Sequence, residues 1–278
     1  MKPNFEQAEK NIDNLVTNSV NKTLYIPLYG KAYVSKKGII LQDKKAEEIW
    51  AEEGFTLKGK SRSKWLAYYM GMRSAVFDNW LRERIAEEKE ALVIHIGCGM
   101  DSRVERIGEM NISWYDVDFP QVIKERRRYY SENEHYHMLE TDIRNNDWIA
   151  DIPKEKKVLV VMEGVSMYLR LEEIKQLFKT ISETFIQAGI LVDCYSDFAA
   201  KASKYKNPIN DVGVTTVYGI DDPKVLEEDT GMSFVKEHEM TPGYMVEELK
   251  GMEKAIFKKV YAGRVSKKMY RLYEYRSV

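Results

Sequence analysis

The sequence predicts an α/β protein in which a mostly parallel, doubly wound sheet follows a helical N-terminal segment. Up to residue 88 the apolar residues recur at helical spacings, and no stretch there has the pattern of a strand. After residue 89, apolar stretches of strand length alternate with amphipathic helical stretches, which is typical of β-α-β units. We therefore predict a helical N-terminal cap over residues 1–88 and a core over residues 89–278.

The cap contains two predicted helices, a short one over Ala46 to Trp50 and a long one over Ser61 to Glu88. Arg73 lies on the apolar stripe of the long helix, because apolar residues such as Tyr69 and Phe77 stand four positions before and after it. A buried guanidinium is costly without an anion. Arg73 therefore pairs either with a protein carboxylate or with a carboxylate of a ligand.

The core contains five predicted strands in its first half. They cover Ala91 to Ile96, Trp114 to Val117, Tyr136 to Thr141, Val158 to Met162 and Ile190 to Val192. Helices are predicted to start near Asp101, at Pro120 and at Leu171, the last running to about Gln187. Proline suits the first turn of a helix, since its missing N–H has no intrahelical partner there.

The pattern blurs from Asp197 to Gly219, where we predict a loop or helical insertion. Loops of this length in a compact domain are often functional, so we predict that it closes as a lid over the active site together with Leu24 to Tyr33. The remaining predicted elements are a helix over Pro223 to Asp229, a strand over Ser233 to Glu239, a helical segment over Tyr244 to Ala262 and a closing strand over Met269 to Tyr275. We expect the tyrosines of the closing strand to pack in the sheet rather than bind a ligand.

Composition excludes several classes of protein. Lys plus Arg number 43 and Asp plus Glu 44, so no global field attracts nucleic acid or an anionic membrane. No apolar run approaches the ~20 residues that span a bilayer, and Met1 to Asn11 is too polar for a signal peptide. Cys98 and Cys194 are too few for a disulfide framework, and His135 and His137 lack a third metal ligand. We expect a cytoplasmic protein without a metal site, and its oligomeric state stays open.

Carboxylates follow four consecutive predicted strands, at Asp101, Asp118, Asp142 and Glu163. In open α/β sheets, ligands bind at the carboxyl ends of the strands, so these acids are expected to converge on one site. Gly97 and Gly99 follow the first strand and let the backbone approach a ligand closely. Asp118 lies 21 residues after Gly97, the interval at which an acid in such folds reaches a ribose.

These residues favour S-adenosylmethionine over a dinucleotide. The dinucleotide fingerprint needs a third glycine, and Ser102 occupies its place. A pyrophosphate would also face Asp101 and Asp118, with only Arg103 or Arg106 to compensate, whereas an acidic pocket favours a cationic ligand. S-adenosylmethionine offers a sulfonium, an ammonium, ribose hydroxyls and an adenine amino group to carboxylates. The alternatives are a dinucleotide-dependent oxidoreductase, or a methyltransferase-like protein that binds the cofactor without catalysis.

Six segments of the chain carry a resemblance to a known family. They are LYIPLYGKAY (Leu24 to Tyr33), MRSAVFDNWL (Met72 to Leu81), IGCGMDSRVER (Ile96 to Arg106), WYDVDFPQVI (Trp114 to Ile123), TDIRNNDW (Thr141 to Trp148) and MEGVSMYL (Met162 to Leu169). In this order they resemble the leucine carboxyl methyltransferase family, particularly its small bacterial branch related to the tetracenomycin polyketide O-methyltransferase. The resemblance covers roughly residues 15–240. It implies a class I S-adenosylmethionine-dependent methyltransferase, Rossmann-like, with a helical N-terminal cap.

The resemblance also implies roles for eight residues, each toward the cofactor. Arg73 would hold its carboxylate and Glu163 its ammonium or the neighbouring backbone. Asp118 would bind the ribose and Asp142, with Ile143 beside it, the adenine amino group. Gly97 and Gly99 would contact the methionyl part, and Lys31 stands where the family usually has a basic residue near the cofactor. His95 departs from the family, which usually has a small or aliphatic residue there.

The other conspicuous residues have structural interpretations. His95 lies in an apolar strand, so we expect a hydrogen-bonded core histidine. Arg126 to Arg128 is interpreted as a solvated helix face. Met162, Met167 and Tyr168 either line the floor of the pocket or pack in the core.

No residue stands out as a catalytic base, so the catalytic residues stay unknown. A phenol with a pKa near 10 needs such a base, whereas a carboxylate with a pKa around 4 is already ionised. The expected activity is therefore O-methylation of a small-molecule acceptor, through a carboxylate rather than a hydroxyl, and Glu163, Asp193 or Asp197 stays open as a base for a hydroxyl.

Overall fold

The computed structural model describes residues 24–53, 62–88, 90–108, 112–206 and 217–277. Within them a seven-stranded sheet has the order β3-β2-β1-β4-β5-β7-β6. β7 is antiparallel to both of its neighbours, and the other pairings are parallel. The predicted α/β class with a mostly parallel sheet is therefore confirmed.

The strands lie close to their predicted positions. Their bounds are β1 (Leu92–Ile96), β2 (Trp114–Asp118), β3 (Tyr136–Glu140), β4 (Val158–Met162), β5 (Ala188–Tyr195), β6 (Met232–Glu237) and β7 (Tyr270–Ser277). β5 is much longer than predicted, because it pairs with β7 all the way from Gly189 to Tyr195. Most residues of these central strands are buried and apolar, as is usual where helices cover both faces of a sheet.

The helices are α2 (Lys44–Glu53), α3 (Lys64–Glu87), α4 (Arg103–Ile107), α5 (Pro120–Arg126), α6 (Leu171–Thr184), α7 (Asp197–Lys206), α8 (Gly243–Glu247), α9 (Gly251–Val260) and α10 (Arg264–Met269). Residues 24–37 form a further helical segment. The helix predicted at Pro223 is a 3-10 turn that ends at Leu226. The helical segment predicted over Tyr244 to Ala262 is broken in two, because the chain turns at Lys250, which is extended, and at Gly251, the first residue of α9, which has a φ of +53°.

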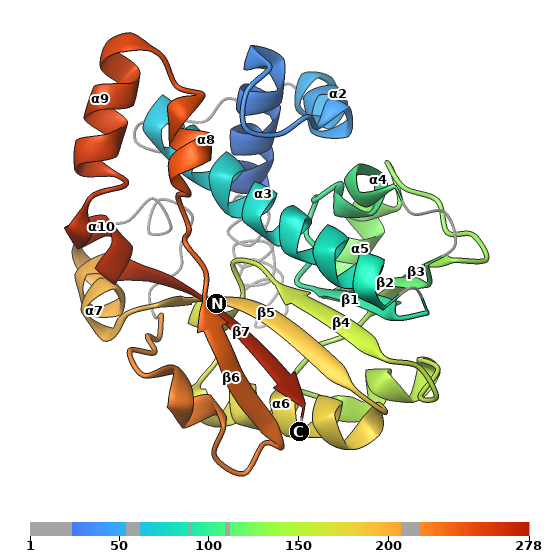
Figure 1. Ribbon diagram of the computed structural model, residues 1–278. Helices are drawn as coiled ribbons and strands as arrows, with labels where there is room; N and C mark the ends of the chain where they lie inside the picture. Colours follow the sequence, from blue (N-terminus) through green and yellow to red (C-terminus); the bar gives the residue numbers. More distant parts are fainter. Residues whose placement is uncertain (1–23, 54–61, 89, 109–111, 207–216, 278) are drawn as a thin grey trace, which may run out of the picture.

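Two apolar clusters cover the two faces of the sheet. Alternate residues such as Val93 and Leu159 belong to the cluster that includes Phe77 of α3. Their neighbours, such as Ile94, belong to the cluster that includes Phe178 of α6. Figure 1 shows α3 lying across one face of the sheet and α6 on the other. The long cap helix is thereby fixed against the strands, with Arg73 near their carboxyl ends.

Part of the predicted insertion is described. Its first residues form α7, and residues 207–216 lie outside the described part of the chain. Val217, which follows, is buried, and the amide of Tyr218 donates to the carbonyl of Met167 at 2.8 Å. Closure of this segment as a lid stays a prediction, as does the division of the chain at residue 89.

The interpretation of Arg126 as a solvated residue is wrong. Its side chain is fully buried beside Asp116 of β2, with 2.5 Å between Nη2 and Oδ2, and its Nη1 donates to the carbonyl of Gly99 at 3.0 Å. α5 follows β2 directly and packs on the sheet, so one face of the helix points back at this strand, whereas Arg127 and Arg128 are exposed. His95 is buried between Asp116 and Arg103, which confirms the predicted core histidine.

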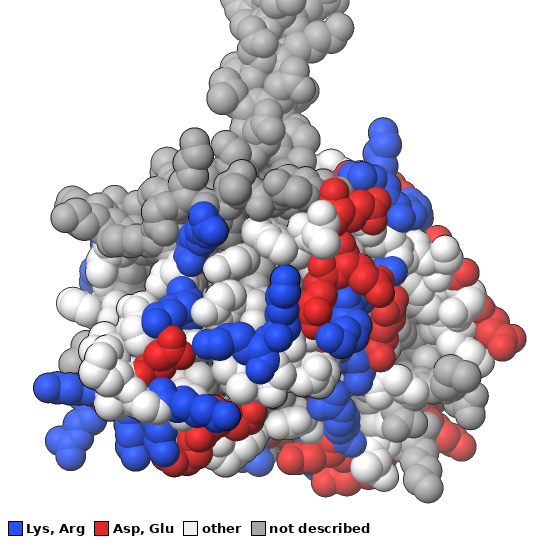
Figure 2. All heavy atoms as spheres, turned by 90° about the horizontal axis from the view of Figure 1, so that it is seen from above, with Lys and Arg blue, Asp and Glu red and all other residues white. Residues whose placement is uncertain are grey.

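The described surface carries both signs of charge. On the face seen from above, Lys and Arg side chains are interspersed with Asp and Glu (Figure 2). Among the described residues, no helix is long and apolar enough to cross a membrane.

Candidate active site

A cavity of about 620 Å³ lies at the carboxyl ends of the parallel strands. This volume is in the range of small-molecule and cofactor sites. All eight residues singled out from the sequence line this cavity, namely Lys31, Arg73, Gly97, Gly99, Asp118, Asp142, Ile143 and Glu163. The structure therefore brings together every predicted site residue, and their contacts define what each can do.

The loop between β1 and α4 depends on its two glycines. Gly97 has a φ of +66° and Gly99 a φ of +50°, which residues with a side chain rarely adopt. A Cβ atom on Gly97 would also stand 2.1 Å from Cγ2 of Val165, far inside van der Waals contact. The loop thus keeps bare backbone against the cavity.

Asp118 ends β2 beside this loop. One carboxylate oxygen accepts from the amide of Gly99 and the other from the amide of Phe119, each at 2.8 Å. Burial raises the pKa of Asp118 to about 6, because the two amide donors and the distant Arg126 offset only part of the desolvation cost. Among the described residues Asp118 has no ion-pair partner within 4.0 Å, so its oxygens retain capacity for hydroxyl donors.

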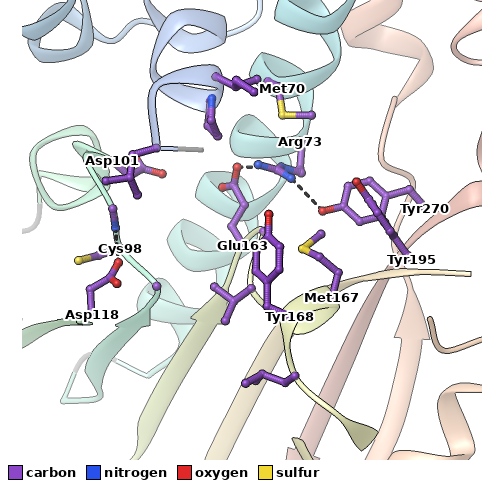
Figure 3. Close-up of a pocket in the computed structure, with 18 of the residues that line it drawn as sticks. Met70, Arg73, Cys98, Asp101, Asp118, Glu163, Met167, Tyr168, Tyr195 and Tyr270 are labelled. Carbon is purple, nitrogen blue, oxygen red and sulfur yellow. Dashed lines mark hydrogen bonds and ion pairs between the residues drawn. The ribbon is translucent and has the colours of Figure 1, made fainter. Parts of the chain in front are cut away.

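Arg73 and Glu163 lie at the centre of the cavity (Figure 3). Nε of Arg73 donates to Oε1 of Glu163 at 2.9 Å, and Nη1 donates to the hydroxyl of Tyr270 at 2.9 Å and lies 3.2 Å from Oδ2 of Asp193. The other oxygen of Glu163 accepts from Arg103. Burial raises the pKa of Glu163, but Arg73 and Arg103 outweigh it and hold the pKa below its usual range.

These two residues belong to a larger buried ion network. Its members are Lys31, Arg73, Arg103 and Arg106 on the positive side and Asp43, Asp78, Asp101, Glu163 and Asp193 on the negative side. Four cations against five carboxylates leave a formal charge of −1. Lys31 lies 3.0 Å from Asp101, which ties the helical segment 24–37 to the loop after β1.

The expectation of an acidic pocket is corrected by this network. Asp101, Asp118, Asp142 and Glu163 do converge on the cavity, as predicted. Asp101 and Glu163 are neutralised by network cations, and Asp142 accepts from Nε of Arg144 at 2.8 and 2.9 Å. Glu163 takes its partners Arg73 and Arg103 from distant elements, which the sequence did not reveal, whereas Arg144 stands only two residues from Asp142. Among the described residues, Asp118 alone of the four acids has no cation within ion-pair distance.

The cavity has a second part whose wall is aromatic. We call it the tyrosine side, lined by Tyr69, Tyr168, Tyr195, Tyr261 and Tyr270, and the opposite part the glycine side, lined by Gly97, Gly99, Asp118, Asp142 and Ile143. Figure 3 shows Asp118 and the tyrosines Tyr195 and Tyr270 on opposite sides of Arg73 and Glu163. Met167 also lines the cavity, whereas Met162 is buried in the core.

The sequence interpretation missed the role of Tyr270. It was expected to pack in the sheet, yet it lines the cavity and bonds Arg73 and Asp193. Since β7 runs antiparallel to β5, the first residue of β7 lies at the carboxyl end of β5, opposite Tyr195. The direction of the last strand was the signal that could have placed Tyr270 at the site.

The site fits S-adenosylmethionine. Gly97 and Gly99 both line the cavity with positive φ and without a side chain, and Asp118 offers buried oxygens of the kind that ribose hydroxyls need. The network's charge of −1 and the unpaired Asp118 suit a ligand whose sulfonium and ammonium outnumber its carboxylate. Strand order, glycine loop and strand-end acids together define the class I S-adenosylmethionine-dependent methyltransferases.

Comparisons with known proteins agree with this class. The model of the family described as leucine carboxyl methyltransferase matches residues 12–182, so the chain belongs to this family. The tetracenomycin polyketide synthesis O-methyltransferase TcmP of Streptomyces glaucescens is 26% identical over 238 residues, 84% of this chain and 88% of that protein. The S-adenosyl-L-methionine-dependent methyltransferase dpfgK of Gibberella zeae is 27% identical over 230 residues, 74% of this chain and 77% of that protein.

Solved structures support the fold. A candidate methyltransferase from Thermobifida fusca has a TM-score of 0.59 at 13% identity, with 89% of this chain and 94% of that chain covered. The magnesium protoporphyrin IX methyltransferase ChlM of Synechocystis, with bound S-adenosylhomocysteine (SAH), has a TM-score of 0.51 at 11% identity, with 84% and 93% covered. The predicted family, fold and cofactor class are confirmed.

Proposed function

We propose that this protein is an S-adenosylmethionine-dependent O-methyltransferase that methylates a carboxylate of a small molecule. One observation carries the choice of a carboxylate: among the described residues, no accessible, unpaired base lines the tyrosine side. His95 and Asp193 are buried and engaged, and Glu163 is held between two arginines. An acceptor that is already anionic at neutral pH needs no such base.

The cofactor is proposed to lie across the glycine side. Gly97 and Gly99 would contact its methionyl part, Asp118 its ribose, and Asp142 with Ile143 its adenine. Arg73 would take its carboxylate and Glu163 its ammonium, with Lys31 holding Asp101 in place below them. All of these residues line the cavity, and those that follow strands lie in the order of β3, β2, β1 and β4 along the sheet, which supports this placement.

The acceptor is proposed to lie on the tyrosine side. Its lining of tyrosines and residues such as Met70, Met167 and Met269 suits a small molecule with an apolar body. The cofactor supplies an activated methyl group on its sulfonium. The protein then has to align the acceptor oxygen with that methyl, and such alignment can supply ~7 to 11 kcal/mol of the barrier. No proton has to be moved from a carboxylate acceptor.

The relatives support the proposal to different degrees. The family name specifies a carboxyl methyltransferase, and the Streptomyces protein is named as an O-methyltransferase of tetracenomycin polyketide synthesis. A hydroxyl acceptor is the competing possibility, and the product distinguishes the two.

The test is the chemical nature and pH dependence of the product. We expect a methyl ester that mild base hydrolyses, formed at a rate that stays flat from about pH 6 to 9 with both substrates saturating, because the acceptor pKa of roughly 4 has been passed. Acceptors can be drawn from small molecules that co-purify with the protein, identified by mass spectrometry. A base-stable methyl ether, or a first-order rise in rate through neutral pH, would contradict carboxyl methylation.

A further inference from the structure

We propose that Tyr270 and Asp193 are positioning residues that hold the Arg73 guanidinium with its Nη2 edge turned to the cofactor carboxylate. The inference rests on the proposed placement of the cofactor. Both residues lie beyond residue 182, where the family match ends, and neither was assigned to cofactor binding from the sequence.

The guanidinium of Arg73 is held on two of its three nitrogens. Nε is bound by Glu163 of the β4 loop, and Nη1 by the hydroxyl of Tyr270 and the carboxylate of Asp193. The three partners come from β4, β5 and β7, while Arg73 itself comes from α3. Because a guanidinium is planar, contacts at two nitrogens fix the direction of the third.

The third nitrogen, Nη2, is available to a ligand. Within the described residues, no protein group accepts a hydrogen bond from it. A Cβ atom on Gly164 would stand 3.5 Å from Nη2, and Gly164 has a φ of +75°, so the chain keeps the space beside this nitrogen clear of a side chain. Arg73 lines the cavity, so a guanidinium edge that no described residue accepts from can bind a carboxylate oxygen of a ligand there.

The positioning pair is itself rigidly held. The Tyr270 hydroxyl donates to Oδ2 of Asp193 at 2.6 Å, and both oxygens of Asp193 accept from the amide of Gly164, at 2.8 and 3.0 Å. The ring of Tyr270 packs edge-on against Tyr195, with 4.8 Å between centroids, and stacks on Tyr69 at 6.3 Å. Removing the hydroxyl therefore removes one constraint on Arg73 while the ring keeps its place.

The variant that isolates this contact is Tyr270→Phe, and two probes separate its effects. S-adenosylhomocysteine carries the carboxylate, whereas 5′-deoxy-5′-methylthioadenosine has the adenosyl part and sulfur without the amino-acid end. Calorimetry of Tyr270→Phe should show S-adenosylhomocysteine binding weakened about tenfold, the size expected for a hydrogen bond to a charged group, with the affinity for methylthioadenosine unchanged.

Two controls make the result specific. Tyr275→Phe removes a hydroxyl from a buried tyrosine of the same strand that donates to the carbonyl of Pro223, and it should change neither affinity. In an Arg73→Ala background, Tyr270→Phe should have no further effect on S-adenosylhomocysteine, because it acts through Arg73.

Several outcomes would overturn the inference while leaving the proposed function standing. These are an unchanged affinity of Tyr270→Phe for S-adenosylhomocysteine, equal weakening of both probes, or additive effects with Arg73→Ala. Asp193→Asn provides a second variant and should weaken S-adenosylhomocysteine selectively in the same way. Failure of the unsubstituted protein to bind either probe would contradict the proposed function and the inference together.

Discussion

At the scale of single residues, the site depends on backbone shape and on one carboxylate. A glycine is required at position 97 for two reasons. Its φ is positive, and a Cβ atom there would stand only 2.1 Å from Val165. Asp118 is the strand-end acid that has no cation partner in the described structure, and its oxygens are oriented by backbone amides. Gly97 and Asp118 each lead to a prediction that can be measured.

Replacing Gly97 by Ala should abolish cofactor binding, because the loop must shift to relieve the contact with Val165. Gly38→Ala is a matched control: Gly38 has a φ of +67°, but nothing lies within 4 Å of its Cβ position. Both variants should lose stability by about 1 kcal/mol from the strained φ. Only Gly97→Ala should lose S-adenosylhomocysteine binding in calorimetry, and retained binding would show that the loop does not contact the ligand.

The affinity for S-adenosylhomocysteine should depend on pH through Asp118. The buried carboxyl has a pKa raised to about 6, so it becomes protonated as the pH falls through 6 and no longer accepts hydroxyl hydrogen bonds at both oxygens. We expect constant affinity above pH 7 and a fall approaching tenfold per pH unit below pH 6. Asp118→Asn should bind S-adenosylhomocysteine more weakly at pH 8, and its affinity should no longer fall below pH 6. If the affinity of this variant still falls, the group that titrates is a different one, such as Asp193.

At the scale of elements, α3 connects the cap to the catalytic edge of the sheet through the ion network. Asp78 of α3 accepts from Nε of Arg103 at 2.8 Å and from Nε of Arg106 at 2.7 Å, so α4 is anchored to α3 by two buried arginines. Burial raises the pKa of Asp78, but these arginines outweigh it and leave the pKa below its usual value. The anchor keeps the Gly97 loop, which leads into α4, in its position.

Asp78→Ala should therefore destabilise the protein by roughly 3–5 kcal/mol, since it leaves two buried arginines short of an anion. Glu87→Ala is a control on the same helix, because Glu87 is more than half exposed and, within the described part of the chain, forms an ion pair only with Arg84. Its cost should be about 0.2–1 kcal/mol. Urea denaturation measures both free energies of unfolding, and similar costs for the two variants would mean that the network contributes little to stability.

At the scale of the whole molecule, the cavity joins parts of the chain that are distant in sequence. The cavity is lined by residues from Leu24 to Tyr270, so a ligand in it contacts the cap, the parallel strands and the C-terminal strand at once. A ligand that binds only the folded state stabilises it by mass action.

S-adenosylhomocysteine at 100 times its Kd should raise the midpoint of thermal unfolding by about 5–10 °C, from a stabilisation of about 2.7 kcal/mol. NADH at the same concentration should produce no shift, which tests the dinucleotide alternative by differential scanning calorimetry. The Gly97→Ala variant serves as the negative control. A shift with NADH alone would reverse the assignment of the ligand.

The sequence predicted much of the fold because its information is local. Strands such as Val158–Met162 are apolar runs between polar loops, and Pro120 marks a helix start, so elements could be located without tertiary contacts. The sites of Gly97, Asp118 and Glu163 at strand ends follow from the same periodicity. The spacing of acids along the chain then indicated which edge of the sheet binds the ligand.

The sequence by itself determined the class of fold, the edge of the sheet that carries the site and the residues that follow each strand, because these depend on patterns a few residues long. Only the tertiary structure decided the charge of the site and the environment of Arg73. Arg103, Arg126, Asp193 and Tyr270 reach their partners from separate elements, across as many as 197 positions of the chain between Arg73 and Tyr270. Burial makes such long-range pairs necessary, since an ion removed from water must find its counter-ion wherever the fold brings one.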